Sequence, residues 1–407
     1  MTEPSRSPFT VAVAGTEDLP GGPPPALVDR VRSRLAVSGG EPTSAAVAAA
    51  IRAEAGGVAS DLDVLAALRV LRQEFVGAGP LDELLRDPRT TDVLVSGPAA
   101  VWVDRGCGLQ RADVRFPDEA AVRRLAQRLA LSAGRRLDDA SPYVDGWLSE
   151  AGVRLHAVLP PVAADGTCLS LRVLRPAAHD LAALRRLGTV SAEGEALLRA
   201  IVAARLAFLV SGGTGSGKTT LLTALLSSVD PCERIITVED AEELRPRHPH
   251  VVRLVARPAN IEGAGGVGLR DLVRQALRMR PDRLVVGEVR GAEVCDLLAA
   301  LNTGHDGGAG TVHANSAREV PARLEALAGL GGLSRAALHS QLGAAVQVVL
   351  HMRRRRNGGR VLDGLGVLDR DSAQVAVRPA WTRSNGWAEA RPQLGELFAD
   401  RGAAAPW

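Results

Sequence analysis

Residues 212–219 read Gly-Gly-Thr-Gly-Ser-Gly-Lys-Thr, and this stretch decides the fold. It matches G-x-x-x-x-G-K-[ST], the pattern in which backbone amides and one lysine surround nucleotide phosphates. An apolar run, 206–210, precedes it and a helical run, 220–226, follows it, which is the strand, loop and helix order that the motif requires. Lys218 is the only lysine in the chain, whereas arginine supplies the other 48 basic residues. We therefore predict a phosphate-binding loop.

Each part of this loop has an expected task. Lys218 is expected to hold the β- and γ-phosphates, and the Thr219 hydroxyl is expected to bind Mg²⁺. The glycines let N–H groups turn towards phosphate oxygens, and the following helix adds the positive end of its dipole. The loop alone leaves ATPase, GTPase and kinase open. The expected nucleotide-binding residues are Gly212, Gly213, Thr214, Gly215, Ser216, Gly217, Lys218, Thr219 and Thr220.

Two further strands are predicted to end in carboxylates. The run 283–286 leads to Glu288, preceded by Gly287 where many phosphate-loop proteins carry a metal-linked aspartate. The run 235–238 leads to Glu239 and Asp240, which either position metal and water or form an ion pair at the strand end. A glycine-rich stretch, 304–315, carries His305 and His313, which are either structural or report the γ-phosphate.

Length, net charge and cysteine content limit the possible domain number, partners and cellular compartment. A chain of 407 residues exceeds the size of one hydrophobic core, so two domains are expected. The net charge of +3 is too balanced to indicate a nucleic-acid coat. Four scattered cysteines without a C-x-x-C pair suggest no zinc site and a reducing compartment. No leader pattern and no run of about 18 apolar residues stands out, so we expect a cytoplasmic protein that docks on a membrane.

Periodicity divides the chain into segments. Short β runs alternate with helical patterns after about residue 190, which predicts parallel strands with crossover helices. The fold class is therefore α/β, with a C-terminal phosphate-loop domain and a smaller α+β N-terminal domain. The expected segments are a flexible arm (1–60), the α+β domain (61–175), a linker (176–190), the phosphate-loop domain (191–369) and a loosely ordered tail (370–407).

The order of the motifs resembles a known superfamily. The phosphate loop, Val-Glu239-Asp240, the Arg278-to-Arg290 stretch and the 303–315 stretch are similar to the Walker A, Asp box, Walker B and His box of the secretion ATPases. These proteins power type II secretion, type IV pili and type IV secretion. The segments 79–88, 91–98 and 152–161 resemble the N-terminal domain of the CpaF and TadA (tight adherence) branch, with Ser96 where asparagine is usual.

The resemblance assigns roles. It implies a RecA-like ATPase domain that uses ATP and Mg²⁺, with Glu288 acting on the lytic water, Glu239 near Mg²⁺ and His313 sensing the nucleotide. Arg154 and Arg172 match arginines that reach the γ-phosphate in the family, where a guanidinium neutralises developing charge. Arg278, Arg280 and Arg290 are candidates for subunit contacts or phosphate charge.

The resemblance also implies a homo-hexamer at the inner face of the cytoplasmic membrane, with pilus or secretion platform proteins as partners. Three functions stay open: a motor for pilus assembly or protein export, a conjugation-type motor for DNA or nucleoprotein, and a regulatory scaffold with low turnover. The run 353–356 of four arginines is either a solvated hairpin or a contact with anionic lipid or an acidic partner. Nucleic acid is the weaker option because aromatic residues, 3% of the chain, do not interleave with basic ones.

Overall fold

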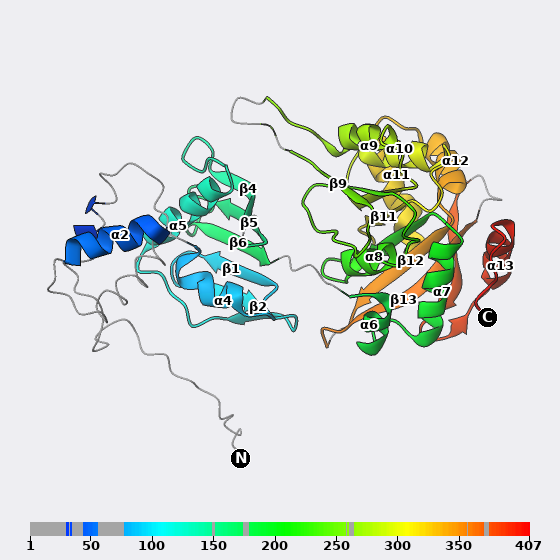
Figure 1. Cartoon of the computed structure of the whole chain (residues 1–407), viewed down its shortest axis with the longest axis horizontal. Coiled ribbons are helices and arrows are strands. Elements are labelled where there is room, and N and C mark those ends of the chain that lie inside the picture. The colour runs from blue at the N-terminus through cyan, green and yellow to red at the C-terminus, as the bar shows by residue number, and fades with distance from the viewer. Residues whose placement is uncertain are drawn as a thin grey trace, which may run out of the picture. The chain divides into compact units, whose positions relative to one another are not determined.

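The structure is a computed structural model and describes residues 30–31, 33–34, 44–55, 77–148, 151–173, 179–257, 259, 264–355, 357–369 and 374–407. The chain divides into two compact units, Met1–Leu174 and Arg175–Trp407 (Figure 1). Helix α2 (Ser44–Ala55) falls within the expected arm, most of which lies outside the described residues.

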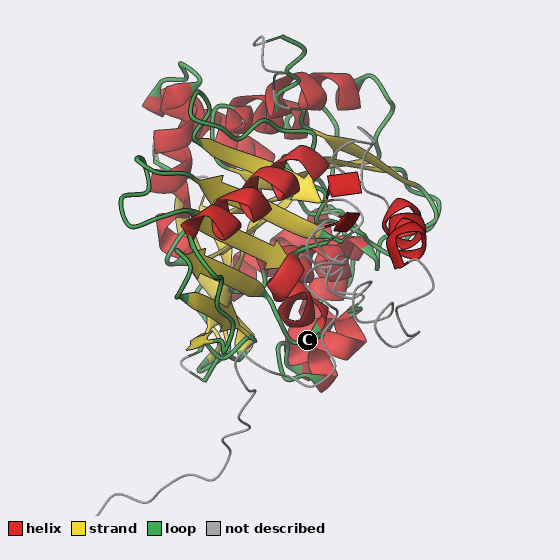
Figure 2. Ribbon diagram, turned by 90° about the vertical axis from the view of Figure 1, so that its left-hand side faces the viewer, coloured by secondary structure: helices red, strands yellow, loops and turns green. Residues whose placement is uncertain are grey.

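The N-terminal unit is built on an antiparallel sheet with the order β3-β2-β1-β6-β5-β4. One face of this sheet is covered by helix α5, whose Val122, Leu125 and Leu129 are buried against the strands. Figure 2, in which this unit faces the viewer, shows a helix lying across the sheet. The α+β domain expected here has these elements: η1 (Gly79–Leu81), α4 (Asp82–Arg86), β1 (Asp92–Ser96), β2 (Val101–Asp104), β3 (Leu109–Arg111), α5 (Glu119–Ser132), β4 (Tyr143–Leu148), β5 (Val153–Val158) and β6 (Cys168–Val173).

The C-terminal unit contains a nine-stranded sheet with the order β15-β14-β13-β12-β7-β11-β10-β8-β9. The six strands from β12 to β9 are parallel, and β13, β14 and β15 continue the sheet as antiparallel hairpins. The parallel strands predicted from the sequence are therefore confirmed. The strands are β7 (Phe208–Gly212), β8 (Ile235–Glu239), β9 (Val251–Val255), β10 (Arg283–Val289), β11 (Ala309–Val312), β12 (Val348–Arg354), β13 (Arg360–Asp369), β14 (Ala376–Thr382) and β15 (Gly386–Trp387).

Both faces of this sheet are buried, which explains why its central strands are apolar throughout. In β7, Phe208 and Val210 face one hydrophobic cluster and Leu209 faces the other. Helices α6 (Leu181–Arg186), α7 (Ala192–Ala203), α8 (Lys218–Leu226) and α13 (Arg391–Asp400) cover the first face. The second face is covered by α9 (Leu269–Leu277), α10 (Glu293–Leu301), α11 (Val320–Leu330) and α12 (Arg335–Ala345), with η2 (Ala317–Glu319) before α11.

The expectation of a loosely ordered tail over 370–407 is wrong for its described part. Strand β14 pairs with β13, and α13 buries Leu394 and Phe398 in the core. The prolines that suggested disorder occupy tolerated places: Pro392 lies in the first turn of α13, where no helical N–H bond is lost. Pro379 lies where the register of β13 and β14 shifts.

The expected linker 176–190 also contains structure. Helix α6 begins after Asp180, whose carboxylate accepts a hydrogen bond from the Ala183 N–H at 2.6 Å. Leu181 and Leu184 are buried against the C-terminal core. The helix has only six residues, which is too short for periodicity to reveal it. Across the described residues, no helix is long and apolar enough to cross a membrane.

A buried ion pair lies at the edge of the sheet where the parallel strands begin. Arg283, at the start of β10, has 2% of its side chain exposed and donates to both Glu233 oxygens at 2.8 and 2.9 Å. It also donates to the Val202 carbonyl at 2.8 Å. A buried guanidinium without its carboxylate is strongly unfavourable.

We predict that Glu233→Ala lowers the free energy of unfolding by about 3 to 5 kcal/mol, because it leaves the Arg283 charge buried and unpaired. The matched control is Glu242→Ala, which removes a pair with the half-exposed Arg245 and Arg253 and costs below about 1 kcal/mol. Urea unfolding of the full chain, followed by circular dichroism, measures both. Equal losses in the two variants would contradict the prediction.

Candidate nucleotide-binding site

The loop 212–217 connects β7 to α8 at the carboxyl edge of the sheet, as the sequence predicts. Gly217 precedes α8 with φ of 94°, a left-handed conformation that side chains rarely adopt. At Gly212, a Cβ atom would lie 2.4 Å from the Met352 carbonyl oxygen and 2.6 Å from Ser216 Oγ. Glycine at these two positions is therefore a requirement of the loop's shape.

The Lys218 ammonium group lies inside the loop. Its Nζ donates hydrogen bonds to the Gly212 and Gly213 carbonyl oxygens at 3.0 and 3.1 Å, and 9% of the residue is exposed. Burial lowers the pKa of Lys218, and the nearby Glu288 carboxylate opposes this shift. The amine is thus held by the loop that would surround a phosphate group.

Thr219, the first residue after this lysine, contacts an acidic side chain. Its hydroxyl lies 3.3 Å from Glu243 Oε2. Across the described residues there is no cluster of three or more His, Cys, Asp or Glu side chains suited to a metal ion. Mg²⁺ in phosphate-transfer sites takes most of its ligands from phosphates and water, so one hydroxyl with a nearby carboxylate suits it. The donor chemistry here fits that ion.

Glu239 ends β8 and is 3% exposed. One of its oxygens, Oε1, accepts hydrogen bonds from the Glu243 and Leu244 N–H groups at 3.2 and 3.0 Å. Burial raises the pKa of Glu239 to about 7, and the Leu244 N–H partly opposes that rise. The carboxyl group is therefore poised to change its protonation state near neutral pH.

The Glu239 side chain also explains the absent aspartate at position 287. A Cβ atom on Gly287 would lie 2.7 Å from Glu239 Cγ and 2.9 Å from its Oε1. Glu239 thus occupies the space that a side chain on the neighbouring strand would need. The buried carboxylate at this edge of the sheet comes from β8, and β10 accommodates it by carrying glycine.

Glu288 follows at an irregular point of β10. The pairing of β10 with β11 shifts between Val286 and Val289, and such a bulge re-aims the side chain that it contains. Arg290 donates a hydrogen bond to Glu288 Oε2. Because Glu288 is close enough to Lys218 to oppose the fall of its pKa, the structure brings the Walker A and Walker B candidates together.

The two candidate histidines lie at opposite edges of the sheet. His313 follows the carboxyl end of β11, beside the end of β7, and is exposed. His305 precedes β11 and its Nδ1 lies 3.1 Å from the Ala300 carbonyl. Arg278 and Arg280 also come before their strand, β10, whereas Arg290 follows it. Of these five residues, only His313 and Arg290 share the edge of the phosphate loop.

Arg154 and Arg172 are direct cross-strand neighbours on β5 and β6. Arg154 pairs with Asp145 at 2.7 Å, and Arg172 pairs with Asp92 at 3.0 Å. The flanking residues Leu155 and Leu171 are buried beneath them. The two guanidinium groups therefore come from the same face of the N-terminal sheet, opposite its core. Whether they act on a nucleotide stays a prediction.

Sequence reasoning missed three features of this edge. Glu243 was not singled out, although it belongs to an acidic cluster that begins at Glu239. Ser211 on β7 bonds His351 Nδ1 on β12 at 2.9 Å, and both are buried. The arginine run after β12 lies in a hairpin beside the phosphate loop, where Arg360 Nε donates to the Gly215 carbonyl at 2.9 Å. Only Glu243 had a local signal in the sequence.

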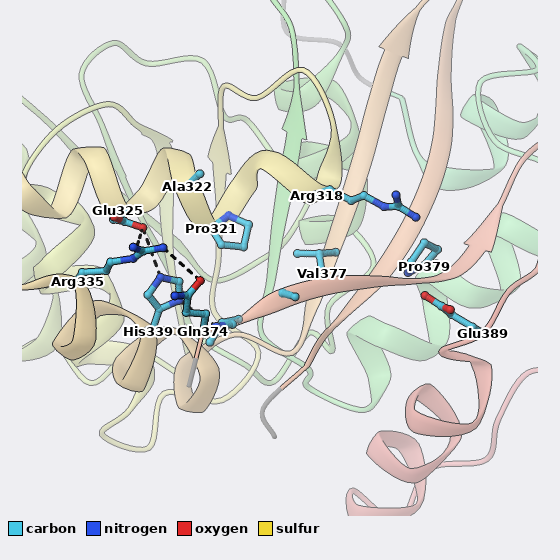
Figure 3. Close-up of a pocket in the computed structure, with 12 residues that line it drawn as sticks. Arg318, Pro321, Ala322, Glu325, Arg335, His339, Gln374, Val377, Pro379 and Glu389 are labelled. Carbon is cyan, nitrogen blue, oxygen red and sulfur yellow. Dashed lines mark hydrogen bonds and ion pairs between the residues drawn. The ribbon is translucent and has the colours of Figure 1, made fainter. Parts of the chain in front are cut away.

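Two hollows lie outside the phosphate loop. The one drawn in Figure 3, of about 420 Å³, is lined by residues of α11, α12 and β14. Glu325 contacts Arg335 at 3.2 Å and His339 at 3.5 Å, and the Val375 N–H donates to His339 Nδ1 at 3.0 Å. Its charged groups thus contact one another. A smaller hollow of about 190 Å³ adjoins it, and neither includes a residue of the phosphate loop.

Comparison with protein families gives one match that spans most of the chain. The family model described as "Type II/IV secretion system protein" matches residues 74–377. This range includes the whole N-terminal sheet and the C-terminal sheet up to the start of β14. The match therefore extends over the N-terminal sheet as well as the phosphate-loop domain.

Two curated relatives are similar over most of their own length. "Putative conjugal transfer protein Rv3659c" of Mycobacterium tuberculosis is 63% identical over 349 residues, which is 84% of this chain and 99% of that protein. "Protein VirB11" of Agrobacterium fabrum is 33% identical over 265 residues, which is 58% of this chain and 75% of that protein.

One solved structure supports the fold. The crystal structure of the pilus retraction motor PilT with bound ADP has a TM-score of 0.51 and 22% identity, and the match covers 72% of this chain and 83% of PilT. At this identity the likeness concerns the fold alone. It agrees with a RecA-like C-terminal domain preceded by a smaller N-terminal domain.

We predict that Gly287→Ala lowers ATP turnover about 100-fold, because the new methyl group displaces the Glu239 carboxylate by a fraction of an ångström to an ångström. The control is Gly329→Ala in α11, where a Cβ atom meets nothing within 4 Å. Phosphate release measures turnover, and the melting temperature shows whether the fold is kept. Full turnover in folded Gly287→Ala would show that the position of Glu239 is unimportant.

Proposed function

This chain belongs to the type II/IV secretion system protein family, and we propose that it hydrolyses ATP to drive a membrane-bound transfer machine. The observation that carries the proposal is the meeting of Lys218, Glu288 and the Thr219–Glu243 pair at one sheet edge. These are the groups that phosphoryl transfer to water needs: a cation for the phosphates, a carboxylate for the water and a hydroxyl for the metal.

In the proposed reaction, the loop amides and Lys218 hold the β- and γ-phosphates. Bound Mg²⁺ would neutralise charge on the same oxygens, with Thr219 as its ligand and Glu239 or Glu243 beside it. Glu288 orients the attacking water and accepts its proton, and Arg290 keeps the carboxylate in place. His313, after β11, is placed to sense whether the γ-phosphate is present.

The N-terminal domain contributes positive charge in this proposal. Arg154 and Arg172 stand side by side on β5 and β6, and each has an aspartate partner within its own unit. Exchange of those aspartates for the γ-phosphate would stabilise the transition state, which is worth about 10³ to 10⁵ in rate in other phosphate-loop enzymes. This exchange would couple hydrolysis to movement of the domain.

The machine is proposed to be a ring of six subunits at the cytoplasmic face of the inner membrane. The name of the 63% identical relative favours conjugal transfer, whereas the N-terminal motifs favour a tight-adherence pilus. Both machines would use the same ATPase site. The tight-adherence branch and the hexamer remain predictions.

We predict that Lys218→Ala abolishes ATP hydrolysis and leaves the fold intact, since the lysine contacts only the loop in the described structure. Glu288→Gln should lower turnover more than 100-fold while ATP still binds, because the amide cannot accept the water's proton. Calorimetry measures binding and phosphate release measures turnover. A low-turnover scaffold would keep its biological activity as Glu288→Gln, and a motor would lose it.

A second experiment separates the two machines. ATP turnover is measured alone, with single- and double-stranded DNA, and with vesicles that contain anionic lipid. A conjugation-type motor should be stimulated by DNA, with an effect that weakens as salt rises. ATP turnover by a pilus motor should rise with the anionic vesicles and should not change with DNA.

A further inference from the structure

The arginine run that ends β12 lies against the phosphate loop. Strand β12 pairs with β7 in parallel up to Met352 and Gly212, so the residues after Met352 extend beside the loop. The hairpin between β12 and β13 is closed by a hydrogen bond in which the Arg355 N–H donates to the Gly359 carbonyl at 2.7 Å. The described residues of this run therefore form the predicted hairpin, and the hairpin lies beside the phosphate loop.

Two arginines of this hairpin reach the loop itself. Arg360 Nε donates to the Gly215 carbonyl at 2.9 Å, and Cδ of the same side chain would lie 3.2 Å from a Cβ on Gly217. Arg354 Nη1 would lie 3.4 Å from a Cβ on Gly215. By contrast, Arg353 turns back to its own hairpin and pairs with Asp363 at 2.6 Å. Arg354 from the run and Arg360 at the start of β13 therefore face the loop, whereas Arg353 does not.

The hairpin stands on the opposite side of β7 from the catalytic carboxylates. Glu288 and Glu239 belong to β10 and β8, which follow β11 on one side of β7, whereas β12 and β13 lie on the other. The γ-phosphate must face Glu288 for water to attack it. A nucleotide is longer than the loop, so its ribose and base must extend beyond the loop, and the hairpin is the element on the side of β7 away from Glu288.

We propose that the β12–β13 hairpin forms the nucleoside side of the site, with the Arg360 guanidinium stacked on the purine ring and Arg354 next to it. This inference rests on the proposed function, since it deepens the same ATP site. A guanidinium is planar, stays charged and stacks well on aromatic rings. Across the described residues, the recorded partner of Arg360 is a carbonyl oxygen and not a carboxylate, which leaves its flat face available for a ring.

The test compares ATP with tripolyphosphate, which has the phosphates but neither ribose nor base. Calorimetry in magnesium buffer gives both dissociation constants for the full chain. For Arg360→Ala we expect ATP to bind about 30-fold more weakly, the size of a desolvated cation–π contact, and tripolyphosphate to bind within about twofold of wild type. Arg354→Ala should act in the same direction with a smaller effect.

The matched control is Arg378→Ala, which removes an arginine from the next hairpin, where it pairs with Asp369 at 2.6 Å. It should change neither dissociation constant. Equal weakening of ATP and tripolyphosphate by Arg360→Ala would mean that the arginine only shapes the phosphate loop, and this result overturns the proposal. Unchanged ATP binding overturns it too. If Arg360→Ala strongly lowers the melting temperature, the dissociation constants of ATP and tripolyphosphate for Arg354→Ala provide the test instead.

Failure of the proposed function would look different. In that case the wild-type chain would bind neither ATP nor tripolyphosphate. Wild type and Arg360→Ala could instead bind both ligands with the same dissociation constants. That result would support the ATP site and contradict the nucleoside role of the hairpin.

Discussion

Everything at the candidate site depends on the parallel pairing of β7 with β11 and β12. Parallel strands end at a common edge, so a loop after β7 meets whatever follows the neighbouring strands. This pairing places Glu288 near Lys218 although 70 positions separate them in the numbering, and it brings the β12–β13 hairpin to the loop from the other side. An antiparallel neighbour would have sent these groups to opposite edges.

Packing and charge are coupled at this edge. Glu239 is buried because Gly287 leaves room for it, and that burial keeps its pKa near neutrality. Lys218 is buried too, and its charge is favoured by Glu288 and Glu243. Phosphate oxygens would relieve the same desolvation by supplying negative charge. The charges at this edge therefore suit a phosphate group that binds together with Mg²⁺.

The sequence predicts those parts of the site whose signal is local. The phosphate loop, the strand ends at Glu239 and Glu288 and the apolar strands all have fixed spacing or periodicity, and the structure confirms their places. Glu243 belongs to an acidic cluster that is visible in the sequence, but its contact with Thr219, like the contact of Arg360 with Gly215, depends on which distant segments meet. The tail was mistaken for a loose end because prolines break helices in general, whereas Pro392 occupies a first-turn position that tolerates it.

The single lysine has a practical consequence for chemistry performed on this protein. Its ε-amine is the one side-chain amine that acylating reagents or amine-directed cross-linkers can attack, and it lies inside the phosphate loop. Burial and hydrogen bonds shield it, while a surface rich in guanidinium groups stays inert to such reagents. Any acetylation of a lysine side chain in this protein would therefore fall within the phosphate loop.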